Sequence, residues 1–380
     1  MAGTADALHK AHKNKNDEFY TQRSDIEKEL NNYNHLSKHN HFFNKVVFCN
    51  CDDPTESNFF KYFADNFTVL GLKKLICTHY EPDENKKSYV LTITRGRDIN
   101  KDGKINRHDV IKTEMLFSNG DFRSKECIDL LKESDVVCTN PPFSLFREYI
   151  AQLIEYDKEF LIIGSQTSIA CKEIFPLIQN NKMWFGCTMN GSNRWFRVPD
   201  NYEMTPAVKI GDGTDGFEKG IKYCFVKAVV WYTNLDCKKR HDEFIPQNYK
   251  HYSETEYQKY DNYDAINIDN VNDIPVDYYG IMGVPITFLH KYNPEQFDIL
   301  GITQRGCHDL VPETRTYDDY IEMTPKGIKT GSTGSKTNGN GNLLGNDGKK
   351  NYFINKDGRI IQSAFTRLFI RRKKGSKNGN

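Results

Sequence analysis

The chain is 380 residues long, which is enough for a large catalytic domain and an appended one. Its content of 38% hydrophobic and 13% aromatic residues excludes a largely disordered protein. A net charge of +1 excludes a whole-protein field that attracts nucleic acid, so any surface for nucleic acid must be local.

Targeting and metal signals are sparse in this sequence. No apolar run reaches membrane-spanning length, and Met1–Lys15 is polar and basic, so we expect a cytoplasmic protein without membrane association. The ten cysteines form no pair of CxxC knuckles, so we expect reduced thiols and no metal.

Short apolar strands alternate with amphipathic helices in the first part of the chain. This alternation predicts an α/β fold with a largely parallel sheet, covered by helices on both faces. The expected strands are residues 46–49, 74–78, 134–139, 160–164 and 226–232, with a hairpin arm at 89–94 and helices at about 57–66 and 144–154.

The composition changes after Asn234, where Tyr, Asp, Lys and Asn become frequent. Strand-like apolar runs return at 280–289, 297–303 and 363–370, and the Gly/Asn/Ser/Thr-rich stretch at about 329–350 predicts a flexible loop. We therefore divide the chain into a mobile basic arm at 1–16, a catalytic domain at 17–235 and a further region at 236–380.

The tetrapeptide Asn140-Pro141-Pro142-Phe143 follows an apolar strand and precedes a helix. Open α/β sheets place their active sites at such a turn. Asn140 offers a side-chain acceptor, Pro141 a carbonyl without a competing donor, and Phe143 a flat apolar face. These groups suit a flat base with an exocyclic amine, which indicates methyl transfer to an amino nitrogen. The alternative is a plain turn with Phe143 in the core.

Further polar residues follow the other strands. The carboxylate of Asp121 could accept from the adenine amine of a nucleotide cofactor, with Phe122 lining the ring, or the pair could form an ordinary loop. Glu81, after the second strand, occupies the place where a carboxylate commonly holds ribose hydroxyls, although it could also be a plain exposed residue.

The segment before the first helix contains Phe19, Tyr20 and Thr21. Its backbone amides and the Thr21 hydroxyl could hold the carboxylate of an amino-acid moiety. The alternative is an N-terminal arm whose aromatic residues pack on the core.

Taken together, the chain resembles the EcoRI-type family of adenine-specific DNA methyltransferases. The resemblance covers most of the chain and rests on Glu18–Thr21, Cys49–Pro54, Ser57–Phe60, Gly71–Leu75, Gly120–Phe122, Asn140–Phe143, Lys172–Leu177 and Gly283–Phe288.

This resemblance implies S-adenosylmethionine as methyl donor and adenine N6 in double-stranded DNA as acceptor, with the target base flipped out of the duplex. It implies a Rossmann-like, mixed methyltransferase sheet with a reversed strand near its end and an appended C-terminal DNA-recognition region. Asn140 and the Pro141 carbonyl would hold the amine, Pro142 would complete the turn, and Phe143 would stack on the base. A restriction endonuclease acting on the same site is a possible partner.

The first loop departs from the usual methyltransferase pattern. It reads Asn50-Cys51-Asp52-Asp53-Pro54 and contains no glycine, a feature shared by the EcoRI-type family. Asn50 and either Asp52 or Asp53 are candidate cofactor contacts, and either aspartate could instead cap the following helix.

Two other segments carry alternative interpretations. Gly191–Arg197 contains Asn193, Arg194, Trp195 and Arg197, which suit a loop touching DNA, although a packed tryptophan beside surface arginines is the alternative. Asp98–Asp109 has the oxygen spacing of a calcium loop, but it follows an expected strand, so a polar hairpin turn is the better interpretation.

Two other functions remain open at this point. One is an amino-methyltransferase acting on RNA or on a protein glutamine, because NPP-aromatic turns also serve those substrates. The other is a catalytically silent DNA-binding subunit, which the glycine-free first loop would explain.

Overall fold

The computed structural model describes residues 19–34, 40–51, 53–81, 83, 85–115, 118–304 and 309–375. The expected basic arm at 1–16 and Asp52 lie outside the described residues. The chain divides into two compact units. We call Met1–Ser168 with Met183–Lys238 the N-terminal unit, and Ile169–Lys182 with Lys239–Asn380 the C-terminal unit.

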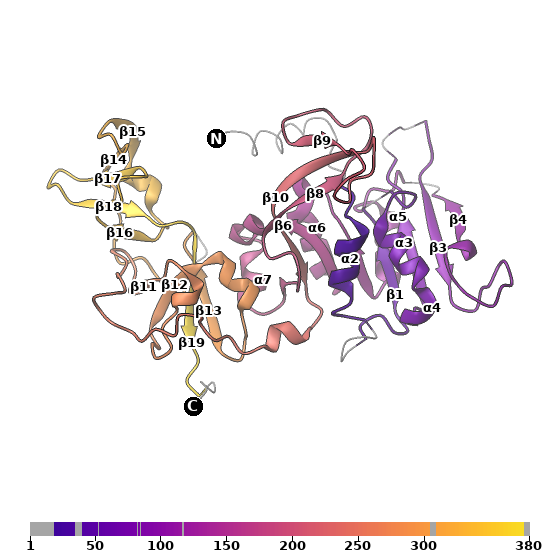
Figure 1. The fold of residues 1–380 in the computed structure, drawn as a ribbon, viewed down its shortest axis with the longest axis horizontal. Helices are drawn as coiled ribbons and strands as arrows, with labels where there is room; N and C mark the ends of the chain where they lie inside the picture. The colour runs from indigo at the N-terminus through magenta and orange to yellow at the C-terminus, as the bar shows by residue number, and fades with distance from the viewer. Residues whose placement is uncertain are drawn as a thin grey trace. The chain divides into compact units, whose positions relative to one another are not determined.

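The N-terminal unit contains one large mixed sheet, whose strand order is β4-β3-β2-β1-β5-β6-β10-β7, with β8 and β9 also paired to β10 (Figure 1). The strands are β1 (Val46–Cys49), β2 (Lys74–Thr78), β3 (Tyr89–Thr94), β4 (Ile111–Glu114), β5 (Val136–Thr139), β6 (Glu159–Ser165), β7 (Trp184–Phe185), β8 (Ser192–Arg197), β9 (Val208–Ile210) and β10 (Lys222–Thr233).

Four neighbouring strands, β2, β1, β5 and β6, are parallel. The strands β1 and β5 are buried at every residue, which explains why they read as unbroken apolar runs. β10 runs antiparallel to β6, so the expected mixed sheet with a reversed strand is confirmed. From β1 the chain moves outward to β2, and from β5 it moves outward to β6 on the other side.

The α2 helix (Arg23–Leu30) precedes β1, and further helices lie in the connections to the parallel strands. They are α3 (Asn58–Asp65), α4 (Phe67–Leu70), α5 (Lys125–Glu133) and α6 (Phe146–Glu155). The α3 helix begins after Ser57, whose hydroxyl accepts from the Phe60 amide at 3.3 Å, and it buries its aromatic face. Short 3₁₀ turns are η1 (Arg107–Asp109), η2 (Phe143–Leu145), η3 (Gln166–Ala170) and η4 (Lys238–His241).

The β3–β4 hairpin contains the segment with calcium-loop spacing. The Asp98 carboxylate accepts from the Gly103 amide at 2.8 Å. The Asp109 carboxylate accepts from the amides of Ile99 and Asn106 at 2.7 and 3.0 Å. The polar hairpin turn is therefore confirmed, and its carboxylates organise the turn through backbone hydrogen bonds.

The C-terminal unit contains α7 (Phe175–Gln179), two further sheets and the 3₁₀ turns η5 (Val271–Asp273), η6 (Ile286–Lys291) and η7 (Gly334–Thr337). One sheet has the order β11-β12-β19-β13 and the other has the order β15-β14-β17-β18-β16. The strands are β11 (Ile266–Asn267), β12 (Ile281–Pro285), β13 (Phe297–Ile302), β14 (Ile321–Met323), β15 (Lys329–Thr333), β16 (Asn342–Leu344), β17 (Tyr352–Ile354), β18 (Ile360–Ser363) and β19 (Arg367–Arg372).

The segment 329–350 is not the flexible loop that its composition predicts. It contains β15, η7 and β16. Its order comes from polar side chains that bond one another: Asn342 is fully buried and accepts from the hydroxyls of Thr337 and Ser363 at 2.7 Å each. A polar composition therefore does not exclude ordered structure when each buried group finds a partner.

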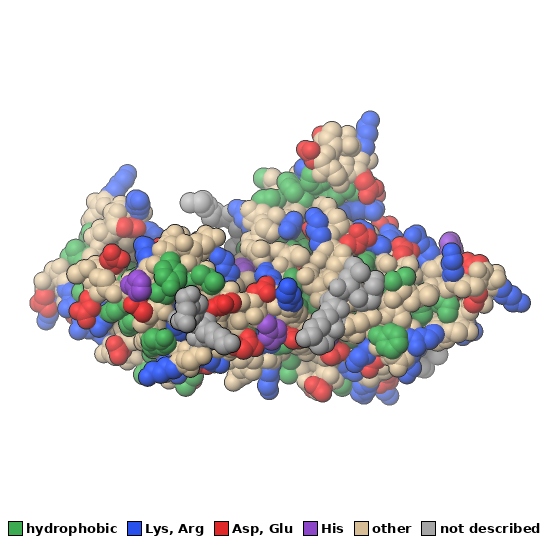
Figure 2. Space-filling view, turned by 60° about the horizontal axis from the view of Figure 1, so that its bottom comes forward, with side chains coloured by type: hydrophobic (Ala, Val, Ile, Leu, Met, Phe, Trp, Pro, Cys, Tyr) green, Lys and Arg blue, Asp and Glu red, His purple; other side chains and the backbone are tan. Residues whose placement is uncertain are grey.

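The described residues contain no helix that is long and apolar enough to span a membrane. On the face in view in Figure 2, the Lys and Arg side chains are interspersed with Asp and Glu, in agreement with the net charge of +1. An electrostatic surface for a polyanion must therefore be local, as the sequence indicates.

We predict that Asn342→Ala lowers the free energy of unfolding by about 1–3 kcal/mol, because the buried Thr337 hydroxyl and the partly buried Ser363 hydroxyl lose their acceptor. Urea unfolding measures this loss, and hydrogen exchange across 329–350 should accelerate. The matched control is Asn346→Ala, which removes an exposed amide in the same sheet region. Equal stability of the two variants would contradict the proposed network.

Candidate active site

Polar residues gather at the carboxyl edge of the parallel strands. Asn50 follows β1, His79 follows β2 and Asn140 follows β5. The ends of β1 and β5 are joined by the Cys51 amide, which donates to the Thr139 hydroxyl at 3.2 Å. Because the strand order changes direction between these two strands, this edge is where α/β sheets form a crevice for ligands.

Asn140 occupies the centre of this edge and is 5% exposed. Its Nδ2 donates to the backbone carbonyl of Phe19. A carbonyl oxygen can only accept, so this bond fixes the orientation of the amide and directs Oδ1 the other way. Oδ1 is buried and accepts no hydrogen bond from the described residues. The site therefore holds a buried acceptor that a ligand N–H could satisfy.

Aromatic rings lie beside this acceptor. The ring of Phe143 is half-buried and lies 5.7 Å from the ring of Phe19 at an interplanar angle of 48°. Phe19 in turn contacts the rings of Phe196 and Tyr202 at 5.8 and 6.2 Å. Phe143 thus packs against the core cluster while part of its side chain stays exposed.

The glycine-free first loop is held by a tyrosine that the sequence analysis did not single out. Tyr149, on α6, donates from its hydroxyl to Asn50 Oδ1, and both residues are buried. Burial raises the pKa of Tyr149 well above its ordinary value, so the phenol stays a donor. The Phe122 ring meets the Tyr149 ring edge-on at 5.0 Å. One buried side chain therefore supports two of the predicted cofactor loops.

His79 is a second residue that the sequence analysis missed. Its Nδ1 lies 3.4 Å from Asp53 Oδ2 and its Nε2 lies 3.7 Å from Glu81 Oε2. The Asp53 carboxylate raises the pKa of His79, against the opposing effect of burial. Burial would raise the pKa of Asp53, but the nearby His79 ring and the hydrogen bonds from Thr55 lower it to about 2. The position of His79 directly after β2 was the signal that could have identified it.

Asp53 does not cap the helix that follows the first loop. Its Oδ1 accepts from the Thr55 amide and hydroxyl at 2.8 and 2.7 Å, which closes a turn before α3. The N-cap of the helix itself is Ser57. Asp53 therefore organises the loop rather than capping the helix.

The loop of Gly120, Asp121 and Phe122 packs on the loop after β2. Gly120 has a φ of +83°, and a Cβ there would overlap the His79 carbonyl oxygen, so only glycine fits. The Glu81 amide donates to the Asn119 carbonyl at 2.8 Å. The two loops thus form one continuous wall, in which Phe122 is buried.

Asp121 is held in an ion pair. Arg123 donates from Nε to Oδ1 at 2.9 Å and from Nη2 to Oδ2 at 2.7 Å. Burial opposes ionisation, but these contacts lower the pKa of Asp121. The carboxylate is therefore an anionic acceptor with lone pairs remaining for a further donor.

The segment Phe19–Thr21 lies against α3 and β8. Tyr20 pairs with Arg197 through two backbone hydrogen bonds, at 2.8 and 3.2 Å. The Thr21 carbonyl accepts from Asn58 Nδ2 at 2.7 Å, and the buried Thr21 hydroxyl bonds to none of the described residues. The segment therefore presents a second buried polar group without a partner, close in the chain to the residue that orients Asn140.

The predicted DNA-contacting loop is a strand. Asn193, Arg194, Trp195 and Arg197 belong to β8, which pairs with the long strand β10. Asn193 Oδ1 accepts from the Ala228 amide at 3.3 Å, where the pairing register shifts and φ of Ala228 is +53°. The expectation of a loop was wrong because cross-strand pairing overrides the flexible composition of this segment.

The charged and aromatic residues of β8 have partners within the unit. Arg194 lies 3.5 Å from Asp25, and Arg197 lies 2.9 Å from Glu56. Trp195 is half-buried, with its ring 5.0 Å from that of Phe225. The packed-tryptophan alternative is therefore part of the structure, and any contact with DNA would use arginines that now face carboxylates.

Most of the predicted site residues thus come together. Backbone or side-chain contacts connect the loops after β1, β2 and β5 with the loop before α5 and with Phe19. β8 joins them through the Tyr20–Arg197 pairing and the Phe19–Phe196 contact. In the part of the chain that the structure describes, no group of three or more His, Cys, Asp or Glu side chains could hold a metal ion.

We predict that His79 makes stability fall with rising pH. Its raised pKa means that the folded state binds the proton more tightly than the unfolded chain. This contribution is complete below the ordinary imidazole pKa of 6.5 and is lost as the pH rises through the higher folded-state pKa. Between about pH 6 and pH 9 the free energy of unfolding of the wild type should fall by on the order of 1 kcal/mol or less through this group. His79→Gln should not show this fall.

Urea unfolding at several pH values measures this difference, with the exposed His108→Gln as control. The same pH slope in the wild type and in His79→Gln would show that the two carboxylates do not hold the imidazolium.

Comparison with known proteins identifies the family of this chain. The model of the family described as "Adenine-specific methyltransferase EcoRI" matches residues 7–373. The chain is 50% identical over 301 residues to the type II methyltransferase M.EcoRI of Escherichia coli, which covers 77% of this chain and 88% of the relative. No solved structure matches the chain.

Two mycoplasma proteins are also similar. The type II methyltransferase M.MgeORF184P of Mycoplasma genitalium is 38% identical over 297 residues, covering 77% of this chain and 85% of the relative. The type II methyltransferase M.MpnI of Mycoplasma pneumoniae is 38% identical over 295 residues, which cover 77% of this chain and 84% of the relative. The chain therefore belongs to the EcoRI family of adenine-specific methyltransferases.

Proposed function

We propose that this methyltransferase modifies adenine N6 at a specific sequence in double-stranded DNA, with S-adenosylmethionine as methyl donor. Family membership supports the reaction class. The observation that carries the proposal is that Asn140 Oδ1 is buried with no partner among the described residues, three positions before the half-buried Phe143. An acceptor next to an aromatic face matches a planar base with an exocyclic amine.

The fold supports a Rossmann-like assignment for the N-terminal unit. Helices separate its parallel strands, and the strand order changes direction between β1 and β5. Ligands of such sheets bind at the carboxyl ends of the strands at this point. We assign catalysis to the N-terminal unit and DNA recognition to the C-terminal unit, in place of the boundary at residue 235 that the sequence predicts.

The residues at this edge fit the cofactor. The buried Thr21 hydroxyl lacks a partner among the described residues, and Gly120 lets the loop before α5 close against the loop after β2. The residues that would hold the cofactor are Phe19, Tyr20, Thr21, Asn50, Asp52, Asp53, Glu81, Asp121 and Phe122. S-adenosylmethionine supplies an electrophilic methyl group when it is bound. Anionic Asp121 suits an adenine amine, and Glu81 suits ribose hydroxyls.

The turn at Asn140 would hold the amine of the target base. The lone pair of this nitrogen is delocalised into the ring, which makes the amine a poor nucleophile. Asn140 Oδ1 and the Pro141 carbonyl would accept its two hydrogens and direct the lone pair out of the ring plane. Pro142 fixes the turn, and Phe143 stacks on the base. Positioning of this kind can supply about 7–11 kcal/mol, so no strong base is required.

The target adenine must leave the duplex to reach this acceptor, because Asn140 is buried at the edge of a sheet. Unpairing and unstacking cost a few kcal/mol. We infer that Asn193, Arg194, Trp195 and Arg197 contact the DNA near the extruded base. Arg194 and Arg197 would exchange Asp25 and Glu56 for phosphates.

The type II names of the relatives place the family in restriction-modification. We infer that a cognate endonuclease recognises the same site in the host and that methylation protects the DNA from it.

We predict that Asn140→Ala lowers kcat by at least about 10²-fold, because one of the two acceptors for the amine is lost. Incubation with labelled cofactor and mixed-sequence DNA, followed by nucleoside analysis, measures the product. The expected product of the wild type is N6-methyladenine. The matched control is Asn201→Ala, which removes an exposed amide from the same unit.

Cofactor affinity and the melting temperature separate loss of chemistry from loss of fold in this experiment. A turnover of Asn140→Ala close to that of the wild type would refute the role of Asn140. A labelled product in RNA or protein, with none in DNA, would refute the substrate assignment.

We predict that Gly120→Ala weakens S-adenosylmethionine binding at least about 10-fold, because a Cβ forces the loops after β2 and before α5 apart. Titration calorimetry measures the affinity. The control is Gly103→Ala, which has a φ of +80° but open space around its Cβ. It therefore carries the same backbone strain without the clash, and equal affinity of the two variants would contradict the predicted cofactor wall.

A further inference from the structure

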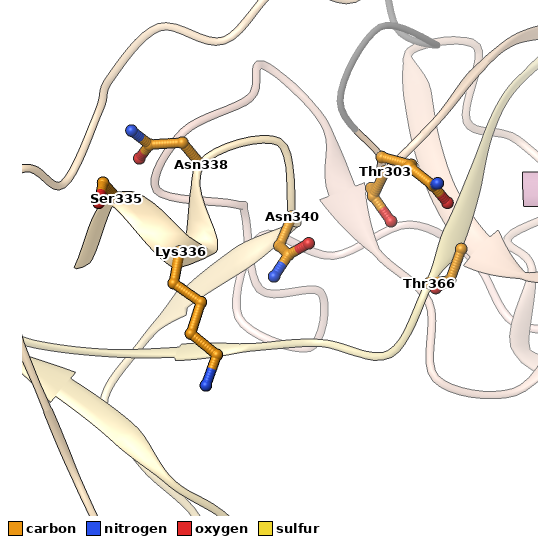
Figure 3. Close-up of a pocket in the computed structure, with 7 residues that line it drawn as sticks. Thr303, Ser335, Lys336, Asn338, Asn340 and Thr366 are labelled. Carbon is orange, nitrogen blue, oxygen red and sulfur yellow. The ribbon is translucent and has the colours of Figure 1, made fainter. Parts of the chain in front are cut away.

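A polar cavity of about 480 Å³ lies within the C-terminal unit (Figure 3). Its lining comes from the end of β13, from η7 with the turn that follows it, and from the residue before β19. The lining residues are Thr303, Gln304, Ser335, Lys336, Asn338, Asn340 and Thr366. Figure 3 shows Asn340 on one side of the cavity, with Thr303 and Thr366 on the other.

Every side chain of this lining carries a hydroxyl, amide or amine group, and none is apolar or acidic. Lys336 is the one charged member, and its Nζ lies 3.1 Å from Glu322 Oε2. The Glu322 side chain is only 7% exposed, and its carboxylate offsets the charge of the lysine. The cavity is therefore a neutral hydrogen-bonding surface, which suits neither an apolar ligand nor a multiply charged anion.

Part of the lining is committed to the fold. Thr303 Oγ1 accepts from the Arg367 amide at 2.8 Å. Asn338 uses both ends of its amide, because Oδ1 accepts from the Tyr317 amide at 3.0 Å and Nδ2 donates to Asp318 at 3.2 Å. These residues shape the cavity but keep little hydrogen-bonding capacity for a ligand.

Three other side chains keep that capacity. The Gln304 amide and the Thr366 hydroxyl have no hydrogen bond to the described residues, and Asn340 uses only Nδ2, at 3.5 Å from Thr337 Oγ1. The backbone at or next to these residues is hydrogen-bonded: the Thr303 amide donates to the Arg367 carbonyl at 2.8 Å, and the Asn340 carbonyl accepts from Asn262 Nδ2 at 2.8 Å. These three side chains therefore keep polar groups for a ligand while the backbone at or next to them is held by hydrogen bonds.

We propose that this cavity reads base edges of DNA and that Gln304 and Asn340 determine part of the recognition sequence. The proposal rests on the proposed function and specifies where its sequence selectivity comes from. A carboxamide offers a donor and an acceptor side by side, which matches the N7 and N6 groups of adenine in the major groove.

The neighbouring residues suit the same partner. Phe365 is 69% exposed directly before Thr366, and a phenyl ring and a threonine methyl group are both suitable contacts for the thymine methyl group. The cavity therefore has the groups to distinguish one base pair from another without a net charge, while phosphate contacts elsewhere supply affinity.

The test compares the wild type with Gln304→Ala and Asn340→Ala. Each gene is expressed in a host without adenine methylation, and methylated sites are mapped across the genome by single-molecule sequencing. Purified proteins are then titrated with duplexes that contain the wild-type site or a scrambled site. Each substitution should lower the ratio of specific to non-specific affinity roughly 5- to 150-fold and relax the mapped sequence at one position.

The matched controls are Gln247→Ala and Asn346→Ala, which remove exposed amides of the same unit outside the cavity. Melting temperature and S-adenosylmethionine affinity should be unchanged in all four variants. The proposal would be overturned if both cavity variants kept the methylated sequence and the ratio of specific to non-specific DNA affinity of the wild type. An equal loss of affinity for every sequence would also overturn it, because that result indicates a phosphate contact.

The wild-type arm tests the proposed function separately. If the wild type methylates no adenine, the function itself fails. If it methylates a defined sequence that the cavity variants also recognise in full, only the inference about the cavity fails.

Discussion

The hydrogen bond from Asn140 Nδ2 to the Phe19 carbonyl is the constraint on which the candidate active site depends. It joins residues that lie 121 positions apart in the chain and fixes which end of the amide faces the ligand. Leaving the other end buried without a partner costs about 1–3 kcal/mol. Binding of an amine would recover this energy, so a group that is unfavourable for the fold becomes favourable for the complex. Phe19 can hold Asn140 because its ring is packed on three others and the next residue, Tyr20, is paired with β8.

Side-chain hydrogen bonds and ion pairs hold the loops at the candidate site in place. The first loop contains no glycine, and a buried phenol on α6 holds its Asn50 in place. The next loop is positioned by His79, which lies between the carboxylates of Asp53 and Glu81. The Asp53 carboxylate raises the pKa of His79, so the proton on this imidazole is bound more tightly in the folded state. Glycine is still required at Gly120, where the loop before α5 touches the backbone after β2.

The C-terminal unit shows how the same residue types can serve structure and recognition. Asn342 has all its polar groups paired in the interior and orders a segment of low-complexity composition. Gln304 and Asn340 belong to the same polar class, yet they keep unpaired groups toward a cavity. The difference lies in the number of partners within reach, because a buried polar group without a partner is costly and one at an open surface is not.

The sequence by itself determined the parallel strands, the motif at Asn140–Phe143 and the family, because apolar periodicity and short strand-end motifs are local properties of the chain. It also predicted the polar hairpin at Asp98–Asp109. Only the tertiary structure identified Tyr149 and His79 as parts of the site, since their partners come from other loops. It likewise turned two expected loops, at β8 and at residues 329–350, into strands. Composition describes what a segment can do alone, whereas pairing with a distant strand decides what it does in the fold.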